Sequence, residues 1–256
     1  MNIILLNFCI YRKYLKFLLK IKKIHNSDKI LESFIKNKKE KFILQIGGND
    51  GEMGDPLRKF FLKKGNYKSI IIEPLNYYFK RLSMLYHGRK DIKTLKYFVS
   101  NFKNKKKIFY IKPKVANQMN GDGPFNNWAH GQGSFSKNFI LNEIDKNNFR
   151  GESYNDKINF FKKSIIFDYV NTIRISDLKI KKNIINILVI DVQGYELNVL
   201  KTINFSKQKF SLIYYEDENL CSENSFLIRK LLNQNNYKLI GFSKTNLCYS
   251  LKQPVR

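Results

Sequence analysis

The chain has 256 residues, a length that favours one full-sized globular domain with an appendage over two domains of equal size. Hydrophobic residues make up 43% and aromatic residues 14%, which is enough to drive collapse and excludes a disordered chain. The formal net charge of +26 invites a nucleic-acid or anionic-membrane partner.

The basic charge nevertheless argues little for a nucleic-acid partner. Only eight of the 47 basic residues are arginines, and the lysines are scattered along the whole chain, as a genome rich in A and T would encode them. Base readers favour arginine, and single-strand binders interleave aromatic and basic residues in a compact module. We see neither pattern and expect no nucleic-acid partner.

The cysteines show no pattern of a disulfide or a metal site. Cys9, Cys221 and Cys248 are far apart and lack ligand spacing, which fits a reducing compartment and predicts a cytoplasmic protein. The three histidines are equally isolated, so no metal is expected.

Residues 1–40 are predicted to form a basic amphipathic helical segment ahead of one domain at residues 41–256. The apolar run of residues 1–10 is too short to span a bilayer. It precedes its basic residues, the reverse of a signal peptide. Two interpretations stay open: the helix packs on the protein's own core, or residues 1–24 lie on a membrane surface, where lysines meet anionic lipid.

Apolar runs and periodic segments alternate from residue 42 onward. This alternation predicts a parallel sheet with crossover helices, hence a doubly wound, Rossmann-like α/β fold. In chain order we expect strand Phe42–Ile46, helix Pro56–Lys64, strand Ser69–Glu73, helix Leu75–Tyr86 and strand Ile92–Val99.

The rhythm breaks between residues 101 and 164, where residues 117–133 are rich in Gly, Asn and Pro. We interpret this region as an insertion over the carboxyl edge of the sheet. Long irregular segments in compact domains are often functional, so it is either a substrate lid or a surface loop without a role.

The sheet rhythm is expected to return at residues 165–175, after which Ser176 is placed to cap a short helical turn. The remaining predicted strands are Ile184–Ile190, Leu212–Glu216, Tyr237–Phe242 and Leu247–Ser250, and the remaining helices are Tyr195–Thr202 and Ser225–Asn233. Together they describe a sheet of the seven-stranded type.

Two features predict a nucleoside-binding half-site. Gly47-Gly48-Asn49-Asp50-Gly51 lies between a strand and a helix, where backbone amides approach a ligand closely and a helix N-terminus faces its anionic group. Glu73 ends the next strand, where a carboxylate accepts hydrogen bonds from both ribose hydroxyls. The turn alone also fits a structural helix entry, but the acid strengthens the functional interpretation.

A third feature is the segment from Asp191 to Glu196, again at the carboxyl end of a strand, where open α/β sheets bind ligands. Its two carboxylates suit a cationic ligand such as the sulfonium of a methyl donor. A methyl transfer there would need alignment, exclusion of water and sometimes a base. Asp191 is expected to place the cofactor, the acceptor or both. Capping of the following helix is the alternative role.

In this order the features resemble the FkbM-type methyltransferase family, over roughly Phe42 to Leu220. One branch of that family opens with Gln-Ile-Gly-Ala-Asn-Asp-Gly and continues to Asp-Pro-Leu. The matching segments are Gln45–Gly51, Asp55-Pro56-Leu57, Ile72-Glu73-Pro74, Gly133-Ser134-Phe135, Val170–Leu178, Ile190–Glu196, Tyr215-Glu216 and Asn219-Leu220.

The resemblance implies an O-methyltransferase that uses S-adenosyl-L-methionine (SAM) and methylates a hydroxyl of a sugar, a glycan or a secondary metabolite. It implies that Asp191 faces the reaction centre and Ser100 approaches the adenine. The cofactor-binding residues implied are Gln45, Gly47, Asn49, Asp50, Gly51, Glu73, Ser100 and Asp191.

The chain departs from the family pattern at two places: the residue expected to contact the methionine ammonium, and the segment expected to hold a catalytic base. Gln45 stands where many class I enzymes carry an acid for the methionine ammonium, although Gln still accepts that hydrogen bond. Gln193 and Glu196 replace the commoner Glu and Asp. The candidate catalytic residues are Asp191, Glu196 and, as a second choice of base, His130, whose unperturbed pKa suits proton removal from a hydroxyl.

Two alternatives remain. One is a non-catalytic member that binds a nucleoside or glycan without turnover, which the loss of the acid at Gln45 makes conceivable. The other is a nucleic-acid-associated methyltransferase. The Asn/Asp-Pro-Pro-Tyr/Phe motif of exocyclic-amine methylation is missing, but ribose methylation stays open.

Overall fold

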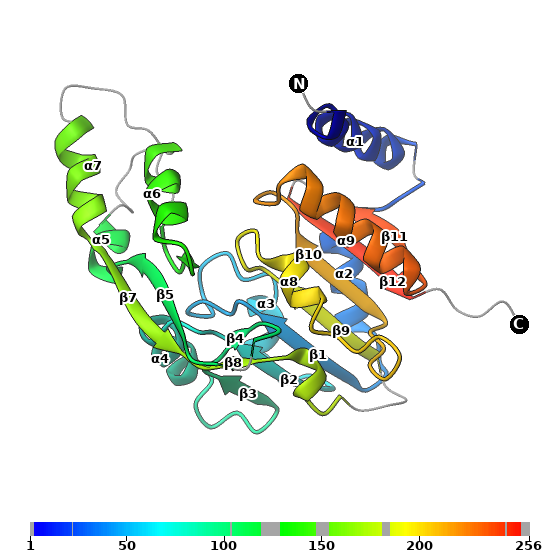
Figure 1. Cartoon of the computed structure of the whole chain (residues 1–256). Coiled ribbons are helices and arrows are strands. Elements are labelled where there is room, and N and C mark those ends of the chain that lie inside the picture. Colours follow the sequence, from blue (N-terminus) through cyan, green and yellow to red (C-terminus); the bar gives the residue numbers. More distant parts are fainter. Residues whose placement is uncertain are drawn as a thin grey trace, which may run out of the picture.

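A seven-stranded sheet runs through the centre of the protein in the computed structural model, which describes residues 3–21, 23–102, 104–118, 129–146, 154–180, 185–243 and 245–251 (Figure 1). Its strands, in spatial order, are β11 (Tyr237–Phe242), β12 (Asn246–Leu251), β10 (Leu212–Glu216), β9 (Ile185–Ile190), β1 (Lys41–Ile46), β2 (Tyr67–Ile72) and β3 (Ile92–Leu95). All neighbours pair in parallel except β12, which is antiparallel to both of its neighbours.

The chain winds outward from β1 to β3 and then returns to place β9 on the other side of β1. The strand order therefore reverses between β1 and β9. In open α/β sheets ligands bind at this switch point, beyond the carboxyl ends of the strands. The predicted Rossmann-like fold is confirmed, with its ligand edge at the ends of β1, β2 and β9.

The sheet is buried on both faces because its central strands are apolar on both faces. Along β9, Ile187 and Val189 pack into one hydrophobic cluster, whereas Leu188 and Ile190 pack into another on the opposite face. Successive side chains of a strand point to opposite faces, so four consecutive apolar residues, Ile187–Ile190, need a layer of helices on each side.

Two layers of helices supply this cover. On one face lie α2 (Ser27–Lys36), α3 (Arg58–Phe61) and α4 (Asn76–Leu85); on the other lie α1 (Ile3–Lys20), α8 (Glu196–Leu200) and α9 (Ser222–Gln234). The helix predicted at residues 56–64 forms only at its centre, as the single turn α3. The single turn α8 likewise occupies only the middle of the helix predicted at residues 195–202.

The region between β3 and β9 has a sheet of its own and several helices. Its elements are β4 (Phe98–Val99), β5 (Lys106–Ile111), α5 (Pro113–Gln118), β6 (Gly133–Ser134), α6 (Lys137–Lys146), α7 (Tyr154–Lys163), β7 (Ile165–Val170), β8 (Thr172–Ile173) and the 3₁₀ turn η1 (Ile175–Asp177). Strand β5 pairs in antiparallel fashion with β6 and with β7.

Three expectations for this region are wrong in detail. The strand predicted at residues 92–99 breaks into β3 and β4, and β4 pairs with β8 outside the main sheet. The strand expected to rejoin the main sheet at residue 165 is β7, which pairs with β5 instead. An apolar run indicates a strand, but it does not identify the partner strand. Ser176 lies inside η1 and does not cap it, because the turn begins after Arg174.

The insertion has its own small core and is joined to the main domain by a second one. Its own core includes Ile111, Ile140, Ile144 and Phe161. The joining cluster unites Leu75 and Tyr78 at the start of α4 with Phe98, Ile108, Tyr110 and Val170. Much of the predicted Gly-rich loop, residues 119–128, lies outside the described residues. Residues 129–133 are described, and His130, Gly131 and Gly133 lie beside Gly47 and Asp191 at the ends of β1 and β9.

Helix α1 packs on the same face of the sheet as α9, at the upper right of Figure 1. Its Leu15 is fully buried in the main core, so the segment packs on the protein itself. Within the described part of the chain, no helix combines the length and hydropathy that crossing a bilayer requires.

Candidate functional site

The glycine turn after β1 is pressed against the end of β9. Gly47 and Gly48 donate their backbone N–H groups to the carbonyl of Ile72, at distances of 3.0 and 3.1 Å. Gly47 has a φ of +84°, and a Cβ atom there would lie 1.8 Å from the carbonyl oxygen of Asp191. No side chain fits in that space, so glycine at position 47 is what lets the ends of β1, β2 and β9 converge.

Glu73 holds this turn from the neighbouring strand. Its Oε2 accepts the backbone N–H of Asn49 at 2.9 Å, and its Oε1 accepts that of Leu75 at 2.8 Å. Asn49 has a φ of +47°, a conformation in which Asn is better tolerated than most residues. Burial raises the pKa of the Glu73 carboxyl to about 8. The acid is therefore a fixed, buried acceptor on the wall of a pocket.

His130 reaches the same pocket from the insertion and is held by Asp50 of the glycine turn. The ring Nε2 lies 3.1 Å from Oδ2 of Asp50, and the imidazole packs edge-on against the Tyr78 ring at 4.7 Å between centroids. Burial by itself raises the pKa of Asp50, but the hydrogen bonds from His130 and from the amides of Glu52 and Met53 outweigh it and hold that pKa well below its usual range.

Asp191 belongs to a polar network at the ends of β9 and β10. Its Oδ1 accepts a hydrogen bond from Nε2 of Gln193 at 2.9 Å, and the same amide nitrogen lies 3.2 Å from Oε2 of Glu216. Asn219 Nδ2 donates to Oε1 of Gln193 at 2.8 Å. Burial raises the pKa of Asp191, and burial together with the nearby Asp191 raises that of Glu216 to about 8. Two acids with raised pKa values, Asp191 and Glu216, thus lie close together.

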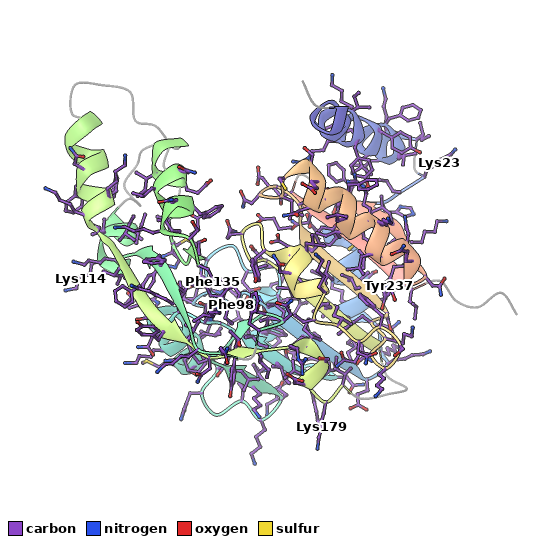
Figure 2. All side chains as sticks on the ribbon, in the orientation of Figure 1. Lys23, Phe98, Lys114, Phe135, Lys179 and Tyr237 are labelled. Atoms are coloured by element: carbon purple, nitrogen blue, oxygen red, sulfur yellow. The ribbon has the colours of Figure 1, made fainter. Side chains whose placement is uncertain are left out.

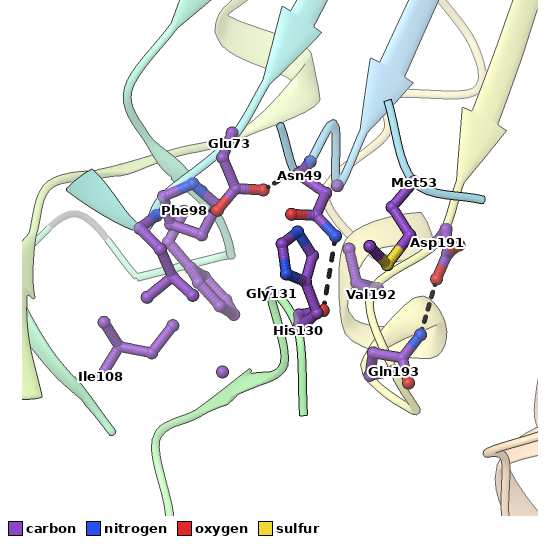
Figure 3. Close-up of a pocket in the computed structure, with 14 residues that line it drawn as sticks. Asn49, Met53, Glu73, Phe98, Ile108, His130, Gly131, Asp191, Val192 and Gln193 are labelled. Atoms are coloured by element: carbon purple, nitrogen blue, oxygen red, sulfur yellow. Dashed lines mark hydrogen bonds between the residues drawn. The ribbon is translucent and has the colours of Figure 1, made fainter. Parts of the chain in front are cut away.

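These residues surround a cavity of about 300 Å³ at the switch point of the sheet (Figure 3). Figure 3 shows His130 in the middle of the site, with Glu73 and Phe98 on one side and Asp191 and Gln193 on the other. The lining residues are Gly47, Asn49, Met53, Glu73, Pro74, Leu75, Phe98, Ile108, His130, Gly131, Gly133, Asp191, Val192 and Gln193. The insertion therefore supplies part of the wall, as a lid would.

Five predicted site residues do not line this cavity. Asp50 lies behind His130, and a Cβ atom on Gly51 would meet the Leu82 side chain of α4 at 2.8 Å. Ser100 is fully buried, and its hydroxyl lies 3.3 Å from that of Tyr195.

Glu196, the fourth, is fully buried, and its Oε1 accepts the amides of Val192 and Gly194, which stabilises the turn after β9. Burial raises its pKa to about 7.

Gln45, the fifth, is paired with an acid. Its Nε2 donates to Oδ1 of Asp55 at 3.1 Å. Burial raises the pKa of Asp55 to about 6. Among the described residues, Oε1 of Gln45 and Oδ2 of Asp55 are buried without a hydrogen-bond partner. Position 45 carries no acid, but Asp55, ten residues further along the chain, lies beside Gln45 in the fold.

Several residues of the site were not predicted individually. Phe98 and Phe135 lie 4.2 Å apart between ring centroids where the insertion meets the main domain (Figure 2), and Tyr195 packs against both. Glu216 and Phe135 belong to segments that match the family pattern, so a signal was present. No sequence signal marks Ile108 and Met53, because an apolar residue that lines a pocket resembles any core residue.

The donor set fits SAM. Glu73 provides a buried acceptor for a ribose diol, and the glycine turn at the end of β1 lines the same pocket through Gly47 and Asn49. Asp55, Asp191 and Glu216 bring three acidic side chains together in a strongly basic protein. Burial raises the pKa of each, and a cationic sulfonium or ammonium group bound beside them would favour their charged forms. In the described part of the chain, no group of three or more His, Cys, Asp or Glu side chains is arranged to hold a metal ion.

This sheet, with its one antiparallel strand, and the acids that end β2 and β9 define a class I SAM-binding methyltransferase fold. The sequence model of the methyltransferase FkbM domain matches residues 45–239. The chain belongs to this family. It is a SAM-dependent methyltransferase, and its cofactor is S-adenosyl-L-methionine.

No curated protein sequence matches the chain. A SAM-dependent methyltransferase from Aquifex aeolicus is 12% identical with a TM-score of 0.40, over 93% of this chain and 96% of that one. The human methyltransferase 10 domain containing protein is 12% identical with a TM-score of 0.43, over 93% of each chain. The family match and the strand order, not these scores, carry the assignment.

Proposed function

We propose that the protein is an O-methyltransferase that transfers the methyl group of SAM to a hydroxyl of a small molecule, either a sugar or glycan or a secondary metabolite. The observation that supports this proposal is the pairing of His130, on the wall of the pocket, with Asp50 behind it. A neutral hydroxyl is a weak nucleophile, and a histidine held by a carboxylate is suited to take its proton as the methyl group is transferred.

In this proposal Glu73 binds the ribose, and the turn at Gly47 and Asn49, which lines the cavity, holds the methionine end. Asp191 faces the reaction centre, where it orients the cofactor or the acceptor. When bound, SAM would supply an electrophilic methyl group for in-line displacement by the acceptor hydroxyl, and His130 would take the hydroxyl proton. Glu196 and Asp50 act as positioning residues, because each contacts another site residue rather than the cavity.

We further propose that the Gln45–Asp55 pair replaces the single acid that many class I enzymes carry after β1. Neither side chain lines the cavity, but the orphaned oxygen atoms of the two side chains are acceptors of the kind that a methionine ammonium group needs. Asp55 would supply beside Gln45 the acid that is missing at position 45. Its presence argues against the non-catalytic alternative, which rested on that missing acid. The role of Ser100 near the adenine remains a prediction, and its hydroxyl would act there through Tyr195.

The test begins with calorimetric titration of the purified protein with SAM and with its demethylated product, beside a Glu73→Ala variant. One-to-one binding that the variant loses supports the cofactor site. A panel of glycosides, nucleotide sugars and lipid-linked glycans is then incubated with SAM bearing a labelled methyl group. We expect a methyl ether as the product and a loss of kcat in His130→Gln with unchanged SAM affinity.

Two results would overturn the proposal. A methylated nitrogen or carbon in the product would contradict O-methylation. Full turnover by His130→Gln would remove the base from the mechanism while leaving the cofactor site intact, so the two parts of the proposal fail separately.

A further inference from the structure

Over residues 10–20, whose side chains are described, helix α1 docks on the protein by one side only. Leu15 is fully buried, and Tyr11, Leu18 and Leu19 pack partly buried against the same core. The guanidinium of Arg229 in α9 lies 3.8 Å from the centroid of the Tyr11 ring, which fixes this side of the helix to its neighbour. The position of the helix is therefore set by tertiary contacts, and its other sides are open.

A stripe of large apolar side chains runs along an open side. Ile10, Tyr14 and Phe17 are exposed to 53%, 53% and 55%, and Ile21, just beyond the end of the helix, is exposed to 42%. Their spacing of four, three and four residues keeps them on one line of a helix that advances 100° per residue. Scattered exposed apolar residues need no explanation, but an aligned row of four large ones marks an interaction surface.

Lysines accompany the stripe. Lys13, Lys16 and Lys20 are exposed, and at 100° per residue they lie on the adjoining line, away from the docked side. The helix contains no Asp or Glu. In Figure 2 Lys23 extends beyond the end of α1. The outer surface of α1 is thus apolar in the middle and basic at its edge.

We propose that this outer face of α1, formed by Ile10, Tyr14, Phe17 and Ile21 beside Lys13, Lys16 and Lys20, binds an anionic phospholipid surface. Charge selects this partner: the lysines meet lipid phosphates while the apolar row enters the boundary of the acyl chains. A second copy of the chain would bring the same basic charge to the apolar row, and like charges repel. The contact is independent of the acceptor proposed above.

Cosedimentation with vesicles tests the proposal on the full chain. One set contains phosphatidylcholine alone, and the other contains phosphatidylcholine and phosphatidylglycerol in a ratio of about three to one. We expect binding to the anionic vesicles only. The double variant Tyr14→Ser/Phe17→Ser should weaken binding at least about tenfold, because two buried rings are lost from the interface.

Matched variants control for exposure and charge. Phe226 on α9 has the same exposed fraction as Phe17, 55%, so Phe226→Ser should bind as the wild type does. Lys13→Gln/Lys16→Gln/Lys20→Gln should weaken binding far more than Lys63→Gln/Lys64→Gln/Lys68→Gln, which removes the same charge from another surface. Circular dichroism and melting curves verify that each variant is folded.

Three outcomes would overturn the proposal. The first is no binding of the wild type to anionic vesicles. The second is equal weakening by both lysine sets with no effect of Tyr14→Ser/Phe17→Ser, which means general adsorption of a basic protein. The third is a dimer in sedimentation equilibrium that Phe17→Ser dissociates, which means that a second copy covers the stripe.

Discussion

His130 Nε2 lies 3.1 Å from Oδ2 of Asp50, although 80 residues separate them in the chain. The glycine turn and the insertion meet at this bond. They are also close at the next residue, where a Cβ atom on Gly131 would lie 2.5 Å from Nδ2 of Asn49. The turn that is predicted to bind the cofactor therefore also orients the candidate base. Geometry of this kind resembles the carboxylate–imidazole pairs of other enzymes, in which the carboxylate sets the tautomer and direction of the ring.

Asp50→Asn should lower kcat for methyl transfer by about tenfold to a hundredfold while SAM affinity changes little, because the ring loses its anionic partner but keeps its place. Turnover and calorimetric binding measure the two effects, and the pH profile of kcat should shift. Asp91→Asn is the control, since Asp91 pairs with Arg89 outside the site lining. An unchanged kcat and pH profile in Asp50→Asn would show that the pair is structural.

The Gln45–Asp55 pair predicts a rescue by exchange. Asp55→Asn should weaken SAM binding about tenfold, because one charge near the ammonium is lost. Moving the acid back to the strand in Gln45→Asp/Asp55→Asn should restore most of the affinity. Calorimetric titration of both variants with SAM is the measurement. Failure of the exchange variant to bind better than Asp55→Asn, with both folded, would mean that Asp55 does not serve the cofactor.

Gly47 and Gly54 allow a comparison of backbone strain with steric collision. Both have positive φ values, +84° and +67°, but a Cβ atom at position 54 meets nothing within 4 Å. Gly54→Ala should lower the free energy of unfolding by about 1 kcal/mol from strain alone. Gly47→Ala adds the collision with the Asp191 carbonyl and should cost about 3 kcal/mol or more. Urea denaturation of both variants measures the two losses of unfolding free energy. Equal losses would contradict the close approach of Gly47 to the Asp191 carbonyl.

The buried acids predict that the ligand-free protein loses stability as pH rises. The folded pKa of Glu73 is about 8, well above its unfolded value of about 4.3, so the folded protein holds a proton that the unfolded chain has released. This contribution is complete below about pH 4.3 and is lost as pH rises towards 8. Glu196 and Glu216, with pKa values of about 7 and 8, act in the same direction.

Melting curves between pH 5 and pH 8 measure this effect. We expect the melting temperature to fall over that range and to fall less in Glu73→Gln, which has no proton to lose. Glu218→Gln, at an exposed position, is the control and should follow the wild type. Parallel curves for Glu73→Gln and the wild type would show that the Glu73 carboxyl is not shifted.

The sequence by itself determined where the main-sheet strands lie along the chain and which acids end them. Continuous apolar runs such as β9 and β10 have only one stable environment, a sheet covered on both faces, so their limits could be predicted to within a residue. The glycine turn and Glu73 were also visible, because a strand end followed by glycine or by an acid is a local pattern.

Only the tertiary structure decided which residues share the pocket. Asp55 beside Gln45, His130 beside Asp50 and Glu216 near Asp191 meet across ten, 80 and 25 residues, and chain spacing does not encode such contacts. The same holds for β7, whose partner is β5, and for α1, whose pattern fitted a core face or a membrane face alike. Packing decided that α1 docks by Leu15 and leaves the stripe of Tyr14 and Phe17 open, because a hydrophobic side chain is buried by whichever surface the fold brings to it.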